Sequence, residues 1–211
     1  MSLLVFLYQR VTSHDLGLAI ILLTVLIRTV LAPLFYRSLR QQAALRAIQP
    51  HVKHIQDKHK NDKEAQGKAL MELYKEHGVN PFAGIGLLFV QLPVLIALYQ
   101  VFLHPPAGLE YSFLGLISLD KGSTIMVAIA ACLQYVLGVM SVGKNMSPDD
   151  PAMAMARNMT LIGPVITVLV LYSLPSAVGL YWVTTTAYSL VQQIYVNRSY
   201  GTHTGRPEKN S

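Results

Sequence analysis

The chain has 211 residues, of which 52% are hydrophobic and only 13% are charged, and its mean hydropathy is +0.39. This composition excludes an ordinary soluble domain and indicates a protein with several membrane-spanning helices. The single cysteine, Cys132, excludes an internal disulfide and a cysteine-rich metal site. The net charge of +6 is concentrated, because nine of the seventeen Lys and Arg residues fall between Arg37 and Lys75.

The chain opens with a short apolar segment, residues 1–15. Leu3, Leu4, Leu7 and Val11 recur at helical spacing, but the segment is too short to cross a bilayer. We expect an amphipathic helix lying on the membrane surface, and the alternative is a ragged start to the first span. The segment lacks the basic, apolar and small-residue order of a cleavable signal peptide, and we expect no transit peptide either.

The first predicted span, residues 16–36, carries a full charge near its middle. Arg28 lies one turn after Thr24 on the same helical face. A guanidinium inside hydrocarbon costs roughly 2.5–3.5 kcal/mol on insertion scales, and no Asp or Glu lies inside an apolar run. Water, backbone carbonyls or a partner must therefore solvate Arg28, and a water-containing cavity between helices is the simplest arrangement. The alternatives are bonds to carbonyls freed by Pro33, or a side chain that reaches the cytoplasmic surface.

Residues 37–80 turn polar and predict a helical hairpin. Apolar residues recur at helical spacing on both sides of a polar break, DKHKND, and two amphipathic helices would bury these narrow stripes against each other. Pro50 should kink the first helix, whereas Gly78 and Pro81 end the second. The basic charges of the hairpin suit anionic lipid or ribosomal RNA, and the alternative is a solvated helical pair beside the membrane.

The rest of the chain predicts four further spans, so that the expected fold is an all-α membrane protein with five transmembrane helices, a cytoplasmic two-helix hairpin and an N-terminal interfacial helix. Basic residues gather on the side of the hairpin, which places the N-terminus outside and the C-terminus inside. The further spans are residues 81–103, 123–143, 159–175 and 176–197, joined by an extracytoplasmic loop at 104–122 and a methionine-rich cytoplasmic loop at 144–158, with a cytoplasmic tail at 198–211.

Polar and aromatic residues inside the predicted spans are candidates for a common hydrated cleft. The last span contributes a stripe at helical spacing, and the first three contribute a charge, a hydroxyl and two amides. The alternative is ordinary interhelical hydrogen bonding, worth roughly 0.6 kcal/mol per contact, although one amide cannot neutralise an arginine. The candidates are Thr24, Arg28, Gln91, Gln134, Tyr181, Trp182, Thr185, Tyr188 and Gln192.

A cluster of methionines on the cytoplasmic side is a second candidate contact for substrate. Methionine is flexible and polarizable, and adaptable apolar surfaces use it to hold varied partners. The alternative is anchoring of a short loop at the membrane surface. The cluster consists of Met146, Met153, Met155 and Met159.

Catalytic and metal-binding signatures are missing from the sequence. No HExxH, GxSxG or phosphate-binding glycine loop occurs, so we expect no enzyme. His51 and His54 can share a helical face, but no acid or cysteine completes a metal-site spacing. We expect no metal and no cofactor.

Several stretches in this order resemble one family, the YidC-type membrane protein insertases, over roughly residues 16–198. The first three are LLTVLIRTVLAPL, IQPHVKHIQDKHK and LYKEHGVNPFAGIGLLFVQLPVLIALY. The last two are NMSPDDPAMAMARNM and LPSAVGLYWVTTTAYSLVQQIYV. The chain departs from parts of the family because no large extracytoplasmic domain precedes the first span, no lipoprotein cysteine stands near the start, and the tail is short for docking a ribosome.

The resemblance implies a groove open to the cytoplasm and to lipid but closed to the outside. It makes Arg28 the groove arginine with Thr24 as its neighbour, Gln91 the polar residue of the second span, and Tyr181 with Trp182 the aromatic pair of the last span. It also implies insertion and folding of nascent membrane proteins in the bacterial cell membrane without nucleotide hydrolysis. The implied partners are the lipid bilayer, the Sec translocon and the ribosome, with no DNA.

Two other functional classes remain as alternatives. A small anion transporter or channel would also use Arg28, whereas a proton- or cation-coupled carrier commonly places Asp or Glu inside the membrane, and this chain has none there. A passive assembly subunit of a larger complex is the other alternative. Flux of small anions, and insertion by the purified protein alone, separate these classes.

Overall fold

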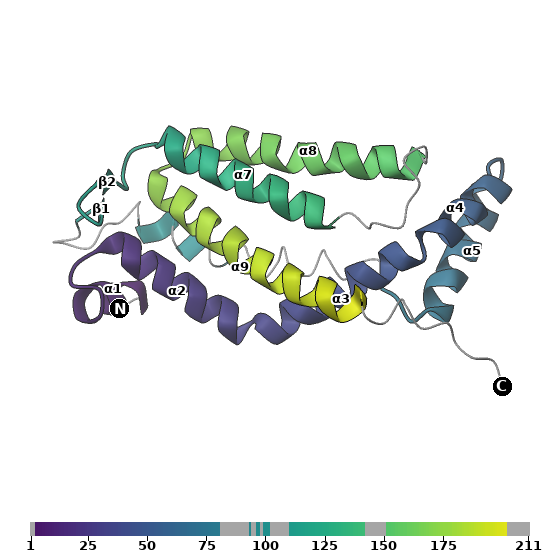
Figure 1. Cartoon of the computed structure of the whole chain (residues 1–211), viewed down its shortest axis with the longest axis horizontal. Coiled ribbons are helices and arrows are strands. Elements are labelled where there is room, and N and C mark those ends of the chain that lie inside the picture. Colours follow the sequence, from purple (N-terminus) through teal and green to yellow (C-terminus); the bar gives the residue numbers. More distant parts are fainter. Residues whose placement is uncertain are drawn as a thin grey trace.

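The computed structural model describes residues 3–80, 110–141 and 151–201, together with residues 93, 96–97 and 99–101. For 151–157, 159 and 199–201 only the backbone is described. Most of these residues are helical, and the long helices run along one axis with a β-hairpin at one end and a helical hairpin at the other (Figure 1). The elements are α1 (Leu3–Arg10), α2 (Leu16–Val30), α3 (Ala32–Ala47), α4 (Gln49–Lys58), α5 (Lys63–Glu76), β1 (Ser112–Phe113), β2 (Ile117–Ser118), α7 (Thr124–Ser141), α8 (Pro151–Tyr172) and α9 (Ser176–Gly201).

The apolar run at residues 16–36 does not form one straight helix. α2 ends at Val30, α3 begins at Ala32, and the two axes are bent by 66°. Pro33 lies in the first turn of α3, where its missing N–H costs nothing, and it cannot continue the hydrogen bonds of α2. α3 then continues to Ala47, well into the segment where the hairpin was expected.

The β-hairpin lies in the predicted extracytoplasmic loop and is tied to the start of α2. One carboxylate oxygen of Asp15 caps α2 by accepting from the Leu18 amide at 2.8 Å, and the other accepts from the Leu114 amide at 2.6 Å. The tip turns through positive φ angles at Leu114 (52°) and Gly115 (67°). An all-α prediction lacks this hairpin, because strands of two residues leave no periodicity in the sequence.

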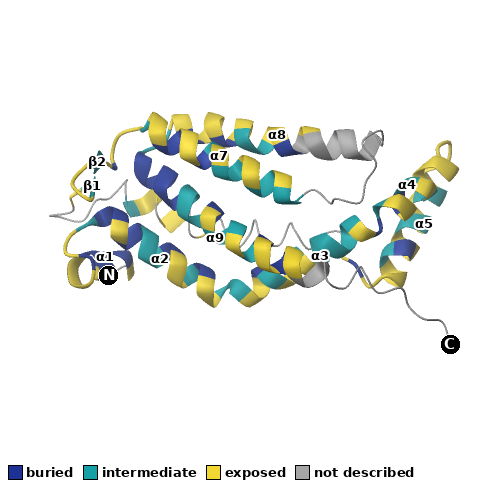
Figure 2. Cartoon of the chain, in the orientation of Figure 1, coloured by how far each residue is buried: buried dark blue, intermediate teal, exposed yellow. Residues whose placement is uncertain are grey.

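An apolar core closes the same end of the molecule, where Figure 2 shows buried residues gathered around α1, α2 and the start of α9. Leu119 is fully buried, and its carbonyl accepts from the Ala177 amide at 3.1 Å. The Lys121 carbonyl accepts from the amide of Ser176 at 2.8 Å and from its hydroxyl. These bonds fix the loop after β2 to the start of α9. The core consists of Leu4, Leu7, Tyr8, Leu16, Ala19, Ile20, Leu119, Met126, Ala177, Leu180 and Tyr181.

α1 packs into this core with only part of its apolar surface. Leu4 and Leu7 are buried, whereas Leu3 and Val11, which share the expected apolar stripe, are exposed. Phe6 is exposed as well. A helix of this kind has one side on the bundle and one side free for the membrane interface.

α7 and α8 approach each other closely. A Cβ added to Gly138 would lie 2.9 Å from the Thr160 side chain, so the absence of a side chain allows this approach. α8 begins at Pro151, at a first-turn position where proline is favoured. The backbone from residue 151 to 158, which we expected in the methionine-rich loop, is therefore helical.

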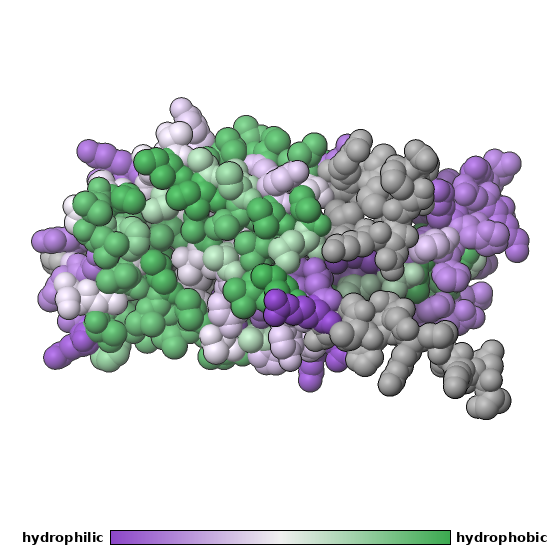
Figure 3. Space-filling view, in the orientation of Figure 1, coloured by the Kyte–Doolittle hydropathy of each residue, from purple (hydrophilic) through white to green (hydrophobic). Residues whose placement is uncertain are grey.

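The described helices carry an apolar outer surface. α7 is long and apolar enough to cross a membrane, and the bent pair α2–α3 passes the same test as one span. Large side chains such as Leu169, 69% exposed, face outward, and Figure 3 shows apolar residues covering the bundle up to hydrophilic residues at the hairpin end. A continuous apolar surface of this size suits lipid. The count of five spans stays a prediction, because residues 81–92, 94–95, 98 and 102–109 lie outside the described residues.

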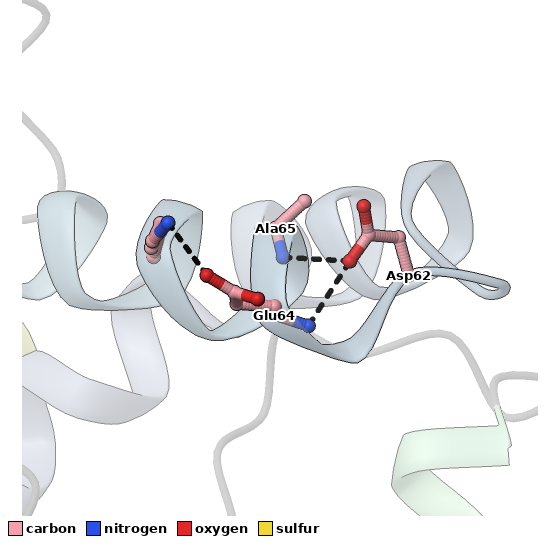
Figure 4. A network of polar contacts seen from close by, with 4 residues as sticks. Asp62, Glu64 and Ala65 are labelled. Carbon is pink, nitrogen blue, oxygen red and sulfur yellow. Dashed lines mark hydrogen bonds and ion pairs between the residues drawn. The ribbon is translucent and has the colours of Figure 1, made fainter.

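α4 and α5 lie side by side and share an apolar core formed by Ile48, Val52, Leu73 and Val79. The helix breaks at Ile48, and Pro50 lies in the first turn of α4. Asp62 caps α5 by accepting from the amides of Glu64 at 3.1 Å and Ala65 at 2.9 Å (Figure 4).

We predict that Gly17→Ala destabilises the closed end. A Cβ at this position would lie 2.2 Å from Cδ2 of Phe113 in β1, so the β-hairpin must move, at a cost of about 1–3 kcal/mol. The measurement is the thermal midpoint of the protein in detergent. Gly67→Ala in α5 is the matched control, because no atom lies within 4 Å and the helix should gain about 0.5–1 kcal/mol. Equal midpoints for the two variants would contradict this packing.

Candidate functional site

Arg28 is buried in the wall that α2 and α9 form, with 6% of its surface exposed. Its Cζ lies 4.2 Å from the centroid of the Phe35 ring, on the other side of the bend. In the described part of the chain no ion pair involves Arg28, and its Nη1 has no hydrogen-bond partner. The face of an aromatic ring thus meets this cation where a carboxylate would be expected.

Thr24 lies one turn earlier and is also buried. Its hydroxyl donates to the carbonyl of Ile20 at 2.6 Å, the usual bond of a threonine inside a helix. The proton of Thr24 is therefore used within α2. The Thr24 oxygen can therefore only accept a hydrogen bond from a ligand.

The polar stripe of α9 faces α2 and α3. Tyr181 and Tyr188 are both close enough to Arg28 for an electrostatic interaction. The hydroxyls of Tyr188 and Thr29 lie 3.2 Å apart, and Thr29 already donates to the carbonyl of Val25 at 2.7 Å. Because a threonine has one hydroxyl proton, Tyr188 is the donor in the contact between the helices.

A third tyrosine extends this contact one heptad further. The rings of Tyr195 and Tyr36 have centroids 5.8 Å apart. Tyr181, Tyr188 and Tyr195 therefore form a seam against α2 and α3, at the seven-residue spacing of paired helices. Exposure rises along the seam from 2% at Tyr181 to 63% at Tyr195. The seam is closed beside the apolar core and open toward the helical hairpin.

Two buried side-chain atoms, Nη1 of Arg28 and Oε1 of Gln192, have no hydrogen-bond partner among the described residues, and a third, Oγ1 of Thr185, lies beside the Tyr181 side chain. All three belong to residues that we expected in the cleft. Buried polar groups in native proteins are nearly always satisfied by protein, water or a ligand. Atoms of this kind on α2 and α9 are therefore candidate contacts for water or a polar ligand.

Other predicted residues lie elsewhere. Trp182 packs with Val127 and Leu171 in a core between α7, α8 and α9, because it is turned 100° from Tyr181 around the helix. Gln134 lies against Gly163 at the interface of α7 and α8. Gln91 and Met146 lie outside the described residues. The side chains of Met153, Met155 and Met159 lie outside them as well.

Phe35 and Gln193 belong to this region but were not expected from the sequence. Phe35 follows Arg28 by seven residues, or two helical turns, and this spacing could have indicated from the sequence that the two side chains share a face. Gln193 is buried and donates to Asn197 at 2.7 Å, and Asn197 donates to the Met140 carbonyl at 3.0 Å. That chain of bonds joins α9 to α7 and serves packing.

An apolar groove of about 530 Å³ lies beside the seam, between α2, α7 and α9. Tyr188 belongs both to the seam and to the wall of this groove. The other residues that line the groove are all apolar except Thr184, so the groove suits hydrocarbon and not water. They are Ile21, Val25, Phe113, Met126, Ile129, Leu180, Val183, Thr184, Ala187 and Val191.

An apolar helical bundle with a buried arginine that has no counter-ion in its described part defines a membrane protein with a polar site at membrane depth. The chain matches the family model described as 60Kd inner membrane protein over residues 6–203. The chain belongs to this family.

Named relatives agree with the family model. Proteins called "Membrane protein insertase YidC" from Francisella philomiragia subsp. philomiragia and Francisella tularensis subsp. novicida are 36% and 37% identical over 186 residues. These matches cover 87% of this chain and 33% of each relative, so the chain spans about a third of the length of the curated relatives it matches. The resemblance to YidC-type insertases is confirmed.

We predict that Arg28→Met leaves the thermal midpoint in detergent unchanged or raises it. Met fills a similar volume and removes a desolvated cation, which costs roughly 2.5–3.5 kcal/mol at membrane depth on insertion scales. Arg37→Met is the control, because Arg37 is exposed in α3 and its replacement should change little. A midpoint far below that of the control would contradict this expectation and show that Arg28 stabilises the fold.

Proposed function

We propose that this protein is a membrane protein insertase that moves polar segments of nascent membrane proteins through a groove open to the cytoplasm and to lipid. Arg28 attracts acidic residues in those segments. The observation that carries the proposal is the set of buried, unpartnered polar atoms on α2 and α9, which includes Nη1 of Arg28. Membership of the family supports it, because its named relatives are insertases.

The asymmetry of the bundle supports a groove with one open end. At one end the β-hairpin, α1 and the start of α9 share an apolar core and direct hydrogen bonds. Toward the other end the tyrosine seam becomes progressively exposed. A polar segment would enter from the open end and stop at the core, so ions would not leak through.

The apolar groove supports a separate path for the hydrophobic part of a substrate. It lies next to the tyrosine seam, so the polar and apolar parts of one substrate can be held side by side. The apolar segment then leaves into lipid, where its burial yields about 25 cal/mol per Å². The membrane potential adds roughly 2.3 kcal/mol per 100 mV for each negative charge moved outward.

A short apolar helix supports local thinning of the bilayer. In the sequence of α8 the polar pair Arg157 and Asn158 precedes the apolar part, which runs from Met159 to Tyr172 and is about 20 Å long at 1.5 Å per residue, against a hydrocarbon core of about 30 Å. A bilayer thinned around α8 would shorten the remaining path for a polar segment.

The proposed insertion requires no covalent reaction and no cofactor. Membership of an insertase family agrees with the expectation that the chain is not an enzyme. Nascent membrane proteins and the bilayer are its proposed partners. The Sec translocon, the ribosome, five spans and an N-terminus outside the bacterial cell membrane stay predictions from the sequence.

We expect Arg28→Ala to reduce insertion by roughly tenfold or more for a short single-span substrate with two aspartates in its translocated segment, because a charge pair away from bulk water is worth that much. Arg28→Lys should retain more activity. Insertion is measured by protease protection in vesicles that contain only this protein and lipid.

The same substrate with asparagines is the control, and its insertion should depend less on position 28. Equal activity of all three proteins on both substrates would remove Arg28 from the mechanism. Rapid chloride flux through the same vesicles, abolished by Arg28→Ala, would favour the anion pathway instead.

A further inference from the structure

The contact between Arg28 and Phe35 is unusual in its setting. Both side chains are buried, with 6% and 8% of their surfaces exposed, and the guanidinium carbon lies 4.2 Å from the ring centroid. Attraction between a cation and a ring face is strongest where water is excluded. Phe35 therefore replaces part of the hydration that burial takes from Arg28.

We propose that Phe35 is a positioning residue that holds the Arg28 guanidinium at membrane depth through its ring face while leaving the net charge available to acidic segments of a substrate. A carboxylate would stabilise the cation more strongly but would cancel the charge. An aromatic ring attracts the cation but is neutral, so the net positive charge remains. The part of this inference that concerns substrate rests on the proposed function.

The bend between α2 and α3 brings the two residues together. Seven residues of straight helix separate side chains by about 10.5 Å along the axis. In a straight helix both side chains would lean the same way, toward the N-terminus, so the lean alone does not close this gap. Arg28 and Phe35 instead lie on two helices whose axes are bent by 66°, which re-aims α3 relative to α2. The break next to Pro33 thus affects how Phe35 meets Arg28.

Phe35 is not accounted for by ordinary core packing in the part of the chain that the structure describes. It is buried, yet it belongs to none of the three apolar clusters around α1–α2–α9, α4–α5 and α7–α8–α9. Its neighbour Tyr36 instead contacts Tyr195. A large buried aromatic ring outside the clusters, with a cation over its face, fits a role tied to that cation.

The test is a series of fluorinated phenylalanines at position 35 of the full chain. Added fluorines weaken the attraction of the ring face for a cation and change its size little. Phenylglyoxal reacts with neutral guanidinium, so the modification rate of Arg28, followed by mass spectrometry of its peptide, should rise with each fluorine. We expect a rise of about twofold to fivefold with trifluorophenylalanine and roughly tenfold with Phe35→Leu.

The same series at Phe6, an exposed phenylalanine in α1, is the matched control and should leave the Arg28 rate unchanged. A rate that does not respond to fluorination at position 35 overturns the inference. If Phe35→Leu fails to fold, the fluorinated series still decides, because those rings keep the shape of phenylalanine.

Insertion gives a second readout that separates this inference from the proposed function. Trifluorophenylalanine at position 35 should lower insertion of the aspartate substrate about twofold to fivefold and spare the asparagine substrate. A rising modification rate with unchanged insertion of both substrates would uphold Phe35 as the residue that holds Arg28. It would overturn the proposed use of Arg28 for acidic segments.

Discussion

A cation kept at membrane depth without a counter-ion is the constraint on which the rest of the site depends. Among the described residues, Arg28 is met by the ring of Phe35 and by the nearby tyrosines of α9, and by no carboxylate. A buried ion pair would satisfy the charge but would also consume it. Neutral, polarizable partners lower the cost of burial and keep a positive potential inside the bundle. The bend of α2–α3 and the stripe of α9 can both be understood as means of supplying such partners.

Much of this site could be predicted from spacing alone. One charge in an apolar run identifies Arg28, and a period of 3.6 residues aligns Tyr181 with Tyr188 on the side that faces it. Periodicity cannot say which neighbour a given side chain meets, because α9 packs against several helices at once. Trp182 and Gln134 therefore lie at the interfaces of α8, although their polarity made them equally plausible members of the cleft.

The fold shows the same division between local and non-local signals. The helical pair α4–α5, with its stripes and its cap at Asp62, follows from local pattern and capping chemistry. Pro33 marks a break, but proline is common inside membrane helices, so its presence alone does not give a bend of 66°. That angle, and with it the contact of Phe35 with Arg28, depends on how α2 and α3 each pack against α9.

The two ends of the bundle differ in the kind of interaction that holds them. The closed end is fixed by an apolar core and by backbone bonds from Ala177 and Ser176, which are costly to break because no water replaces them. The seam from Tyr181 to Tyr195 includes the ring contact of Tyr195 with Tyr36 and the hydroxyl bond of Tyr188 with Thr29, each worth little. The proposed insertase site requires interactions that open at small cost, next to a barrier that does not open. The distribution of strong and weak contacts along α9 meets both requirements, and within the described ranges no acidic residue pairs with the arginine.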